Sequence, residues 1–170
     1  AALLDLGCTE QALADSMINV CWPGRLQRIT EGPLSPSVLG FNAELFLDGA
    51  HNPSGGKVIA DWSNKEDPSN LFIIMGIMKN KNLDEFLKAF GATITKLLAV
   101  RIPDEINAQD PETIMKASSK LKIPCIAAKD IATALQIIKK EESVLPKRIL
   151  ITGSLHLVGK FLEYNLLRQL

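Results

Sequence analysis

Asp48 and His51 stand three residues apart at a point where an apolar segment gives way to a helix. The apolar run Ala43–Leu47 precedes them, and Asn52-Pro53 follows. Asn can cap the free backbone N–H groups of a helix, and proline at the first helical position loses nothing by lacking an N–H. These N–H groups and the positive end of the helix dipole favour an anion. The pair therefore predicts an anion-binding junction, although the same side chains could simply stabilise the turn.

Thr152-Gly153-Ser154-Leu155-His156 forms a second junction of this kind. Ser154 is a natural N-cap, and on spacing alone a cap without a ligand is the simpler interpretation. The same hydroxyl and the helix N–H groups could also receive a carboxylate or a phosphate. His156 is either part of such a site or a partly buried packing residue.

Two basic side chains follow turns. Arg25 comes after Trp22-Pro23-Gly24, and a guanidinium held beside a rigid turn suits bidentate contact with phosphate. Taken alone, such an arginine is more often part of a surface salt bridge. Lys81 lies in the polar loop 79–82. That loop is either a basic patch beside a ligand or a solvated loop in which Asn82 caps the next helix.

The segment Gly55-Gly56-Lys57 imitates a phosphate-binding P-loop without being one. Val58 stands where the motif needs Ser or Thr, and His51 stands where its first glycine should be. Because no other Gly-Lys-Ser/Thr occurs in the sequence, any nucleoside triphosphate must be held partly by something else.

Strand-like and helix-like segments alternate along the chain. Strands are expected at 26–30, 43–47, 71–77, 96–102, 123–127 and 148–152, with helices beginning near 9, 52, 82, 110, 130 and 154 and a turn or hairpin over 31–42. Continuous apolar strands joined by helices indicate a parallel sheet that is covered on both faces. The expected fold is therefore α/β, three-layered and Rossmann-like, with a mostly parallel sheet of about six strands.

Composition excludes several classes of protein. The 170 residues are 46% apolar, and 19 basic side chains balance 19 acidic ones, which argues against a general grip on nucleic acid or an anionic membrane. No apolar run approaches the length of a membrane span, and the first residues do not look like a signal peptide. Cys8, Cys21 and Cys125 form no CxxC pair, so no metal site or disulfide framework is expected and a cytoplasmic protein is favoured.

Four strings together resemble the C-terminal domain of bacterial folylpolyglutamate synthase/dihydrofolate synthase, in the Mur ligase superfamily. They are Trp-Pro-Gly-Arg-Leu-Gln at 22–27, Asp-Gly-Ala-His-Asn-Pro at 48–53, Gly76 with Lys81, and Thr-Gly-Ser-Leu-His-Leu-Val-Gly at 152–159. The resemblance covers about residues 18–170. It implies an ATP-dependent amide ligase in which a substrate carboxylate takes the γ-phosphoryl group and the resulting acyl phosphate reacts with L-glutamate.

The resemblance also implies a division of the chain and a set of partners. Residues 1–21 would be the tail of a preceding N-terminal ATPase domain with the hinge, and residues 22–170 the C-terminal ligase domain. The P-loop, the Mg²⁺ ligands and most of the pterin site would lie in the N-terminal domain, so the fragment alone is expected to be inactive. The implied partners are ATP, L-glutamate, dihydropteroate or a reduced folate and the chain's own N-terminal domain, and the implied state is a monomer.

Site roles follow by matching position in the family. Arg25 resembles a phosphate-contacting arginine, and Asp48 resembles the carboxylate that holds the ATP ribose. His51 resembles a histidine at the interdomain cleft, near the γ-phosphate and the incoming glutamate, and is the expected catalytic residue.

Three further residues match substrate-binding positions. Ser154 resembles a serine suited to the glutamate carboxylates, with His156 as a second candidate there and Lys81 in the loop after the 71–77 strand. Asn80-Lys81-Asn82 departs from the family's usual Asp-Lys-Asp, so this loop has lost two carboxylates.

Two other functions remain open from the sequence. The chain could be a non-catalytic α/β nucleotide- or partner-binding module that keeps these strings as structural turns. It could also be a small independent transferase that uses His51 as a base and Asp48 to orient it.

Overall fold

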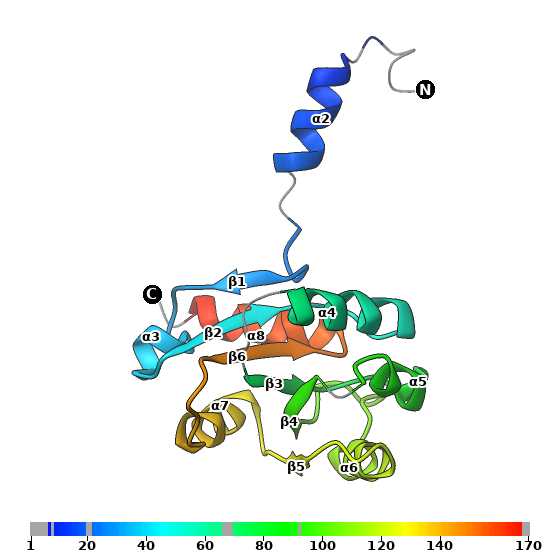
Figure 1. The fold of residues 1–170 in the computed structure, drawn as a ribbon, viewed down its shortest axis with the longest axis vertical. Coiled ribbons are helices and arrows are strands. Elements are labelled where there is room, and N and C mark those ends of the chain that lie inside the picture. Colours follow the sequence, from blue (N-terminus) through cyan, green and yellow to red (C-terminus); the bar gives the residue numbers. More distant parts are fainter. Residues whose placement is uncertain (1–6, 8, 20–21, 66–69, 92, 168–170) are drawn as a thin grey trace.

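A six-stranded sheet forms the centre of the protein. The computed structural model describes residues 7, 9–19, 22–65, 70–91 and 93–167, and among these the strand order is β1-β2-β6-β3-β4-β5 (Figure 1). The strands are β1 (Gln27–Ile29), β2 (Ala43–Leu47), β3 (Asn70–Met75), β4 (Ile94–Ala99), β5 (Cys125–Ala127) and β6 (Lys147–Thr152). The helices are α2 (Glu10–Asn19), α3 (Pro36–Leu39), α4 (Pro53–Lys65), α5 (Leu83–Lys88), α6 (Pro111–Lys120), α7 (Ile131–Lys140) and α8 (Leu155–Leu167).

Strands β2, β6, β3, β4 and β5 are parallel to one another, whereas β1 pairs with β2 in the antiparallel sense. The carboxyl ends of the five parallel strands therefore share one edge of the sheet, which we call the carboxyl edge. The register of the antiparallel pair sets Gln27 opposite Leu47. The start of β1, and Arg25 just before it, consequently lie at the carboxyl edge too.

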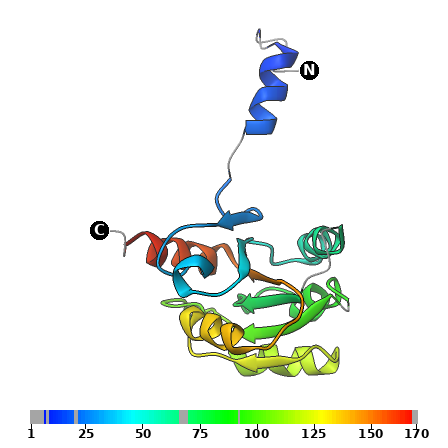
Figure 2. The same cartoon turned by 60° about the vertical axis from the view of Figure 1, so that its left-hand side comes forward.

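Apolar side chains on both faces of the sheet are covered by helices. Along β3, Leu71, Ile73 and Met75 pack with side chains of α4, α5 and α6, whereas Phe72 and Ile74 pack with those of α7 and α8. This alternation is the period of two that a strand imposes. Figure 2 shows α7 and α4 on opposite sides of the strands. The expected three-layer α/β fold is confirmed.

The connections change faces between β2 and its neighbour β6. The chain leaves β2 through α4 on one face, and it leaves β6 through α8 on the opposite face. Adjacent parallel strands whose connections diverge in this way form a topological switch point, where ligands of open α/β sheets bind. The switch point lies at the carboxyl ends of β2 and β6, which are followed by Asp48–His51 and by Gly153–Ser154.

Several strand boundaries differ from those expected: β4 begins at Ile94 where 96 was expected, and β5 begins at Cys125 where 123 was expected. Strands β3 and β4 end before Ile77 and Ile102, although both side chains are buried. An apolar run in the sequence predicts which side chains are buried, but not where a strand ends, and these two residues are buried in loops. The segment 31–42 joins the adjacent antiparallel strands β1 and β2, as the expected turn or hairpin does, and it contains the short helix α3, where Ser35 accepts a hydrogen bond from Val38 N at 3.4 Å.

Helix caps mostly follow the sequence signals. Asn82 accepts from Glu85 N at 3.1 Å, and Asp130 accepts from Thr133 N at 2.7 Å. Asp110 is different, because its carboxylate makes no cap hydrogen bond at the start of α6 and pairs with Arg101 instead. The Arg101 guanidinium pairs with the Asp110 oxygen that would otherwise accept a hydrogen bond from a backbone N–H of α6.

The first helix stands apart from the sheet in Figure 1. The expected helix over 9–20 is observed as α2, and the proposed boundary at 20–21 lies outside the described residues. Trp22–Gly24 is not a free linker, because Gly24 is buried and its carbonyl accepts a hydrogen bond from Gly49 N at 2.8 Å. The division of the chain into residues 1–21 and 22–170 stays a prediction.

Cys125 is half-buried, and this burial raises the pKa of its thiol, which keeps it protonated. Cys8 and Cys21 lie outside the described residues. No helix in the described ranges is long and apolar enough to cross a membrane.

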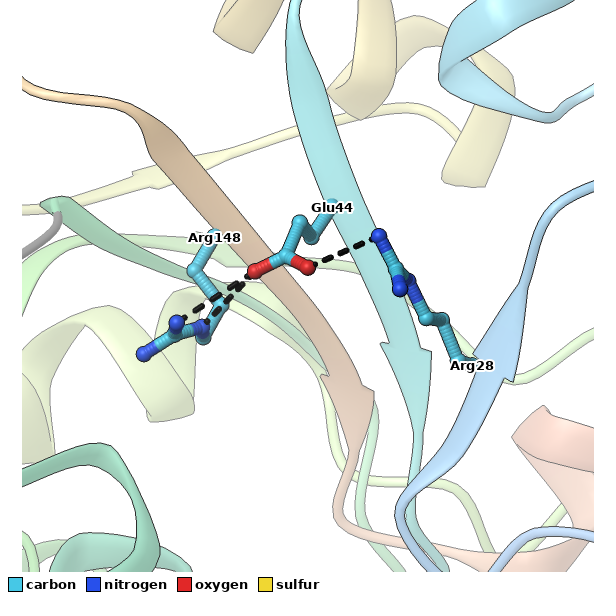
Figure 3. Close-up of polar contacts among 3 residues, drawn as sticks. All are labelled: Arg28, Glu44 and Arg148. Carbon is cyan, nitrogen blue, oxygen red and sulfur yellow. Dashed lines mark hydrogen bonds and ion pairs between the residues drawn. The ribbon is translucent and has the colours of Figure 1, made fainter. Parts of the chain in front are cut away.

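A chain of charged side chains ties three neighbouring strands together (Figure 3). Glu44 on β2 accepts from Arg148 on β6, whose Nε and Nη2 lie 3.4 and 3.3 Å from Oε2, and Arg28 on β1 lies 2.9 Å from Oε1. The Arg148 guanidinium also lies 5.1 Å from the ring centre of Trp62. The Arg148 side chain is only 7% exposed, whereas that of Arg28 is 59% exposed. Glu44 therefore compensates a buried charge.

The substitution Glu44→Gln should lower the free energy of unfolding by about 1–3 kcal/mol, because it leaves the buried Arg148 charge facing a neutral amide. The substitution Arg28→Gln removes the exposed partner and should cost less than about 1 kcal/mol. Urea unfolding of the two variants measures both effects. Equal losses would contradict the assignment of Glu44 to the buried partner.

Candidate functional site

The turn that enters β1 is bonded to the loop that leaves β2. Asp48 accepts two backbone hydrogen bonds, from Leu26 N to Oδ2 at 2.9 Å and from Ala50 N to Oδ1 at 2.8 Å. Gly49 N donates to Gly24 O at 2.8 Å. Asp48 is only 8% exposed. Its carboxylate thus holds together two segments that are distant in the sequence.

Gly49 leaves room for two side chains of the candidate site. A Cβ at this position would come within 2.2 Å of Leu155 Cδ2 and 3.4 Å of Arg25 Nη1. Arg25 itself is exposed. The absence of a side chain at Gly49 therefore lets the first turn of α8 and the Arg25 guanidinium approach the same loop.

The imidazole of His51 is fixed by its own loop. Nδ1 lies 2.8 Å from Gly49 O, and because a carbonyl can only accept, Nδ1 carries the hydrogen. Nε2 of the half-buried ring then remains to accept a proton or a hydrogen bond. The ring is oriented by the carbonyl of Gly49 and not by Asp48, whose hydrogen bonds among the described residues are those from Leu26 N and Ala50 N. The role of orienter that the transferase alternative gives to Asp48 therefore belongs to Gly49 O.

The junction between β6 and α8 is joined to the same loop. Thr152 Oγ1 and Gly153 N donate to the carbonyl of Ala50 at 3.2 and 2.9 Å. Gly153 has a φ of 100°, and a Cβ there would lie 2.7 Å from the carbonyl oxygen of Gly76. Only glycine fits here, since it alone combines that φ with so close an approach. Loops after β2, β6 and β3 consequently meet at one point.

Ser154 and His156 occupy the start of α8. Ser154 is 3% exposed, and its hydroxyl oxygen accepts from His156 N at 3.1 Å, which leaves its own hydrogen free for an acceptor. The His156 side chain is 63% exposed, with Nδ1 3.6 Å from Glu105 Oε2. His156 is therefore not a packing residue.

Lys81 lies in the loop after β3, which is held by a second loop. Lys79 N donates to Asn107 O at 2.8 Å, and Met78 forms an isolated bridge with Ala108. The backbone N–H of Lys81 donates to Met78 O at 3.1 Å. No contact given for the described residues joins the Lys81 ammonium group to the other candidate side chains.

The two glycines of the false P-loop allow α4 to make close contacts. Asn52 caps α4 by accepting from Gly55 N at 2.8 Å. A Cβ at Gly56 would lie 2.9 Å from Ala89 Cβ, next to α5. Gly56 therefore lets α4 approach α5 closely, whereas a Cβ at Gly55 would instead come within 2.8 Å of Ala50 Cβ in the loop before α4.

Hydrogen bonds thus join the segments that carry four of the six predicted site residues, Arg25, Asp48, His51 and Ser154, and we call these joined segments the bonded unit. His156 adjoins Ser154, and Lys81 lies on the neighbouring loop at the same edge. Sequence reasoning missed Glu105, which pairs with His156 across a loop that carries no motif. Within the described residues, no group of three or more His, Cys, Asp or Glu side chains could hold a metal ion.

Comparison with known proteins gives one family and many similar structures. The family model described as dihydrofolate synthetase, C-terminal domain, matches residues 36–164. A curated relative, the probable bifunctional folylpolyglutamate synthase/dihydropteroate synthase of Haloferax volcanii, is 23% identical over 150 residues. That alignment covers 88% of this chain and 16% of the relative.

Two solved structures illustrate the likeness of fold. Escherichia coli FolC in complex with DHPP and ADP superposes with a TM-score of 0.76 at 16% identity, over 95% of this chain and 36% of that one. The bifunctional folylpolyglutamate synthase/dihydrofolate synthase of Yersinia pestis, complexed with AMPPNP and a Mn ion, gives 0.70 at 15% identity, over 91% and 34%. The chain spans about a third of the length of these proteins.

The substitution Gly153→Ala should destabilise the protein by at least about 2 kcal/mol, because two costs add. Alanine disfavours the positive φ, and its Cβ would collide with the carbonyl oxygen of Gly76. Gly91→Ala is the matched control, since Gly91 also has a positive φ, 57°, but nothing lies within 4 Å of a Cβ there. Urea unfolding compares the two variants. A loss at Gly153 no larger than the loss at Gly91 would show that the three loops do not pack as described.

Proposed function

The chain belongs to the family of dihydrofolate synthetase C-terminal domains, and from this premise we propose that it is the C-terminal domain of an ATP-dependent ligase. The ligase adds L-glutamate to dihydropteroate or a reduced folate through an acyl phosphate. The observation that carries the proposal is the bonded unit of Arg25, Asp48, His51 and Ser154 at the switch point between β2 and β6.

The geometry suits a phosphoryl group and an amine that meet beside two helix starts. Arg25 supplies a guanidinium and α4 supplies N–H groups, so both can stabilise negative charge on a transferring phosphoryl group. His51 is the catalytic residue, because Nδ1 is committed to Gly49 O and Nε2 is available for the proton that the attacking ammonium group must lose. Asp48 holds the ribose with the lone pairs that its two backbone hydrogen bonds leave over.

The glutamate carboxylates lie against the start of α8. The Ser154 hydroxyl donates to one carboxylate oxygen, His156 supplies a ring N–H from the first turn of α8, and Lys81 supplies positive charge from the loop after β3. With asparagines at positions 80 and 82, no acidic group within that loop opposes the Lys81 charge.

The described residues do not form a magnesium site. No group of three or more His, Cys, Asp or Glu side chains among them is arranged to hold a metal ion, and in the segment that imitates a P-loop Gly56 serves the packing of α4 on α5. The triphosphate and Mg²⁺ are therefore held by a preceding N-terminal domain, which must close on this one to exclude water from the acyl phosphate. The complete enzyme works as a cytoplasmic monomer.

The 170-residue chain alone should show no ATP-dependent incorporation of labelled glutamate into dihydropteroate or tetrahydrofolate, because it lacks a triphosphate cradle. The full-length enzyme, assayed in parallel, should incorporate it, and the coding sequence upstream should contain Gly-Lys-Ser/Thr. Turnover by the isolated chain, or an upstream sequence without that motif, would overturn the proposal and favour an independent module.

In the full-length enzyme, Arg25→Ala should lower kcat/KM by about 10²–10³, as expected when one preorganised charge is removed from a phosphoryl-transfer site. Arg28→Ala is the control, since Arg28 lies in the same strand region but pairs with Glu44. His51→Asn keeps a donor for Gly49 O and removes the basic nitrogen, so kcat should fall by about 10²-fold or more with folding intact. Unchanged kcat in both site variants would exclude these roles.

A further inference from the structure

A cavity of about 360 Å³ lies between α7 and α8, outside the bonded unit at the switch point. Leu34, Ile131 and Phe161 line its apolar part, and Tyr164 contributes an aromatic side chain at its wall. Leu34 and Phe161 are buried members of the core, so the cavity reaches down to the packed interior. Its volume falls in the range of sites for small organic ligands, about 300–1,000 Å³.

The mouth of the cavity is acidic. Asp104, Asp130 and Glu163 contribute three carboxylates, against the single ammonium group of Lys160. Lys160 Nζ lies 3.0 Å from Asp104 Oδ2 and 3.4 Å from Glu163 Oε2, and hydrogen bonds to these two carboxylates raise the pKa of Lys160. One cation is thus shared by two of the acids.

The third acid is also ionised at neutral pH. The backbone N–H of Thr133 and then its side chain donate hydrogen bonds to Asp130, and they lower the pKa of the Asp130 carboxyl. The charge of the neighbouring Lys129 also lowers the Asp130 pKa. Lys160 and Lys129 together oppose three carboxylates, so this part of the surface keeps one net negative charge beside the apolar lining.

The position of Asp104 is set by the backbone. Asp104 has a φ of 58°, in the left-handed region that Asp tolerates better than most residues. Its neighbour Glu105 pairs with His156 on the same helix that carries Lys160. The loop therefore contacts α8 at two points one turn apart and lines one wall of the cavity.

We propose that this cavity binds a small aromatic monocation, meaning a flat apolar body with one ammonium, amidinium or guanidinium end. The body packs against Ile131 and Phe161, and the cationic end lies between the carboxylates of Asp130 and Glu163. Phosphates and carboxylates, which suit the switch point, are repelled by the same charges. The proposal goes beyond the ligase function and does not depend on it.

Benzamidine is the probe, with neutral benzamide and anionic benzoate as matched controls of nearly equal shape. Titrations of the full chain, followed by amide chemical shifts, should place the benzamidine shifts at Ile131, Ala132 and Phe161. Benzamide should bind at least about tenfold more weakly, benzoate should not bind, and the benzamidine Kd should rise with salt. Equal affinity for benzamidine and benzamide, or shifts centred elsewhere, would overturn the proposal.

Variants separate charge from shape. Asp130→Asn combined with Glu163→Gln keeps a capping residue at the start of α7 and should raise the benzamidine Kd about tenfold or more. Ala132→Leu fills the cavity and should abolish the shifts. Glu112→Gln on α6 removes an exposed acid remote from the cavity and should leave the Kd unchanged. A cavity-filling variant that still binds with the original Kd would overturn the proposal.

Discussion

The carboxylate of Asp48 accepts hydrogen bonds from two backbone N–H groups, one from Leu26 just before β1 and one from Ala50 in the loop after β2. One donor, Leu26, has a positive φ of 42°, a conformation that an isolated leucine avoids. The hydrogen bond to a buried carboxylate compensates that cost. Arg25, next to Leu26 in the chain, takes its position from this contact, whereas the start of α8 is held by the hydrogen bonds of Thr152 and Gly153 to Ala50 O.

Much of the fold follows from the order of apolar runs and helix starts in the sequence. Asn52, Asn82 and Asp130 act as helix caps because a short polar side chain before a helical run has few other partners nearby. Asp110 departs from the rule because Arg101, nine residues away in sequence, competes for it. A cap motif covers only a few consecutive residues, so it cannot show that a more distant side chain will pair with the capping residue in the folded protein.

In the candidate site, too, the features set by neighbouring residues could be predicted, whereas the contacts between distant segments could not. The types and spacing of Asp48, His51 and Ser154 predict a junction of strand and helix, and the structure has junctions there. The expected turn or hairpin over 31–42 allows the antiparallel sense of β1, but nothing in the sequence of this three-residue strand shows that its start lies beside Asp48. The pairing of His156 with Glu105 has no signature either, since the exposed loop around Glu105 has no periodicity that would fix its neighbours.

The direction of β1 also determines where this domain is tethered. Because β1 runs opposite to β2, the polypeptide that joins α2 to the sheet arrives beside the reactive side chains instead of at the far end of the strands. A displacement of Gly24 therefore passes directly to the loop that carries Asp48 and His51, through the backbone hydrogen bond from Gly49 N to Gly24 O.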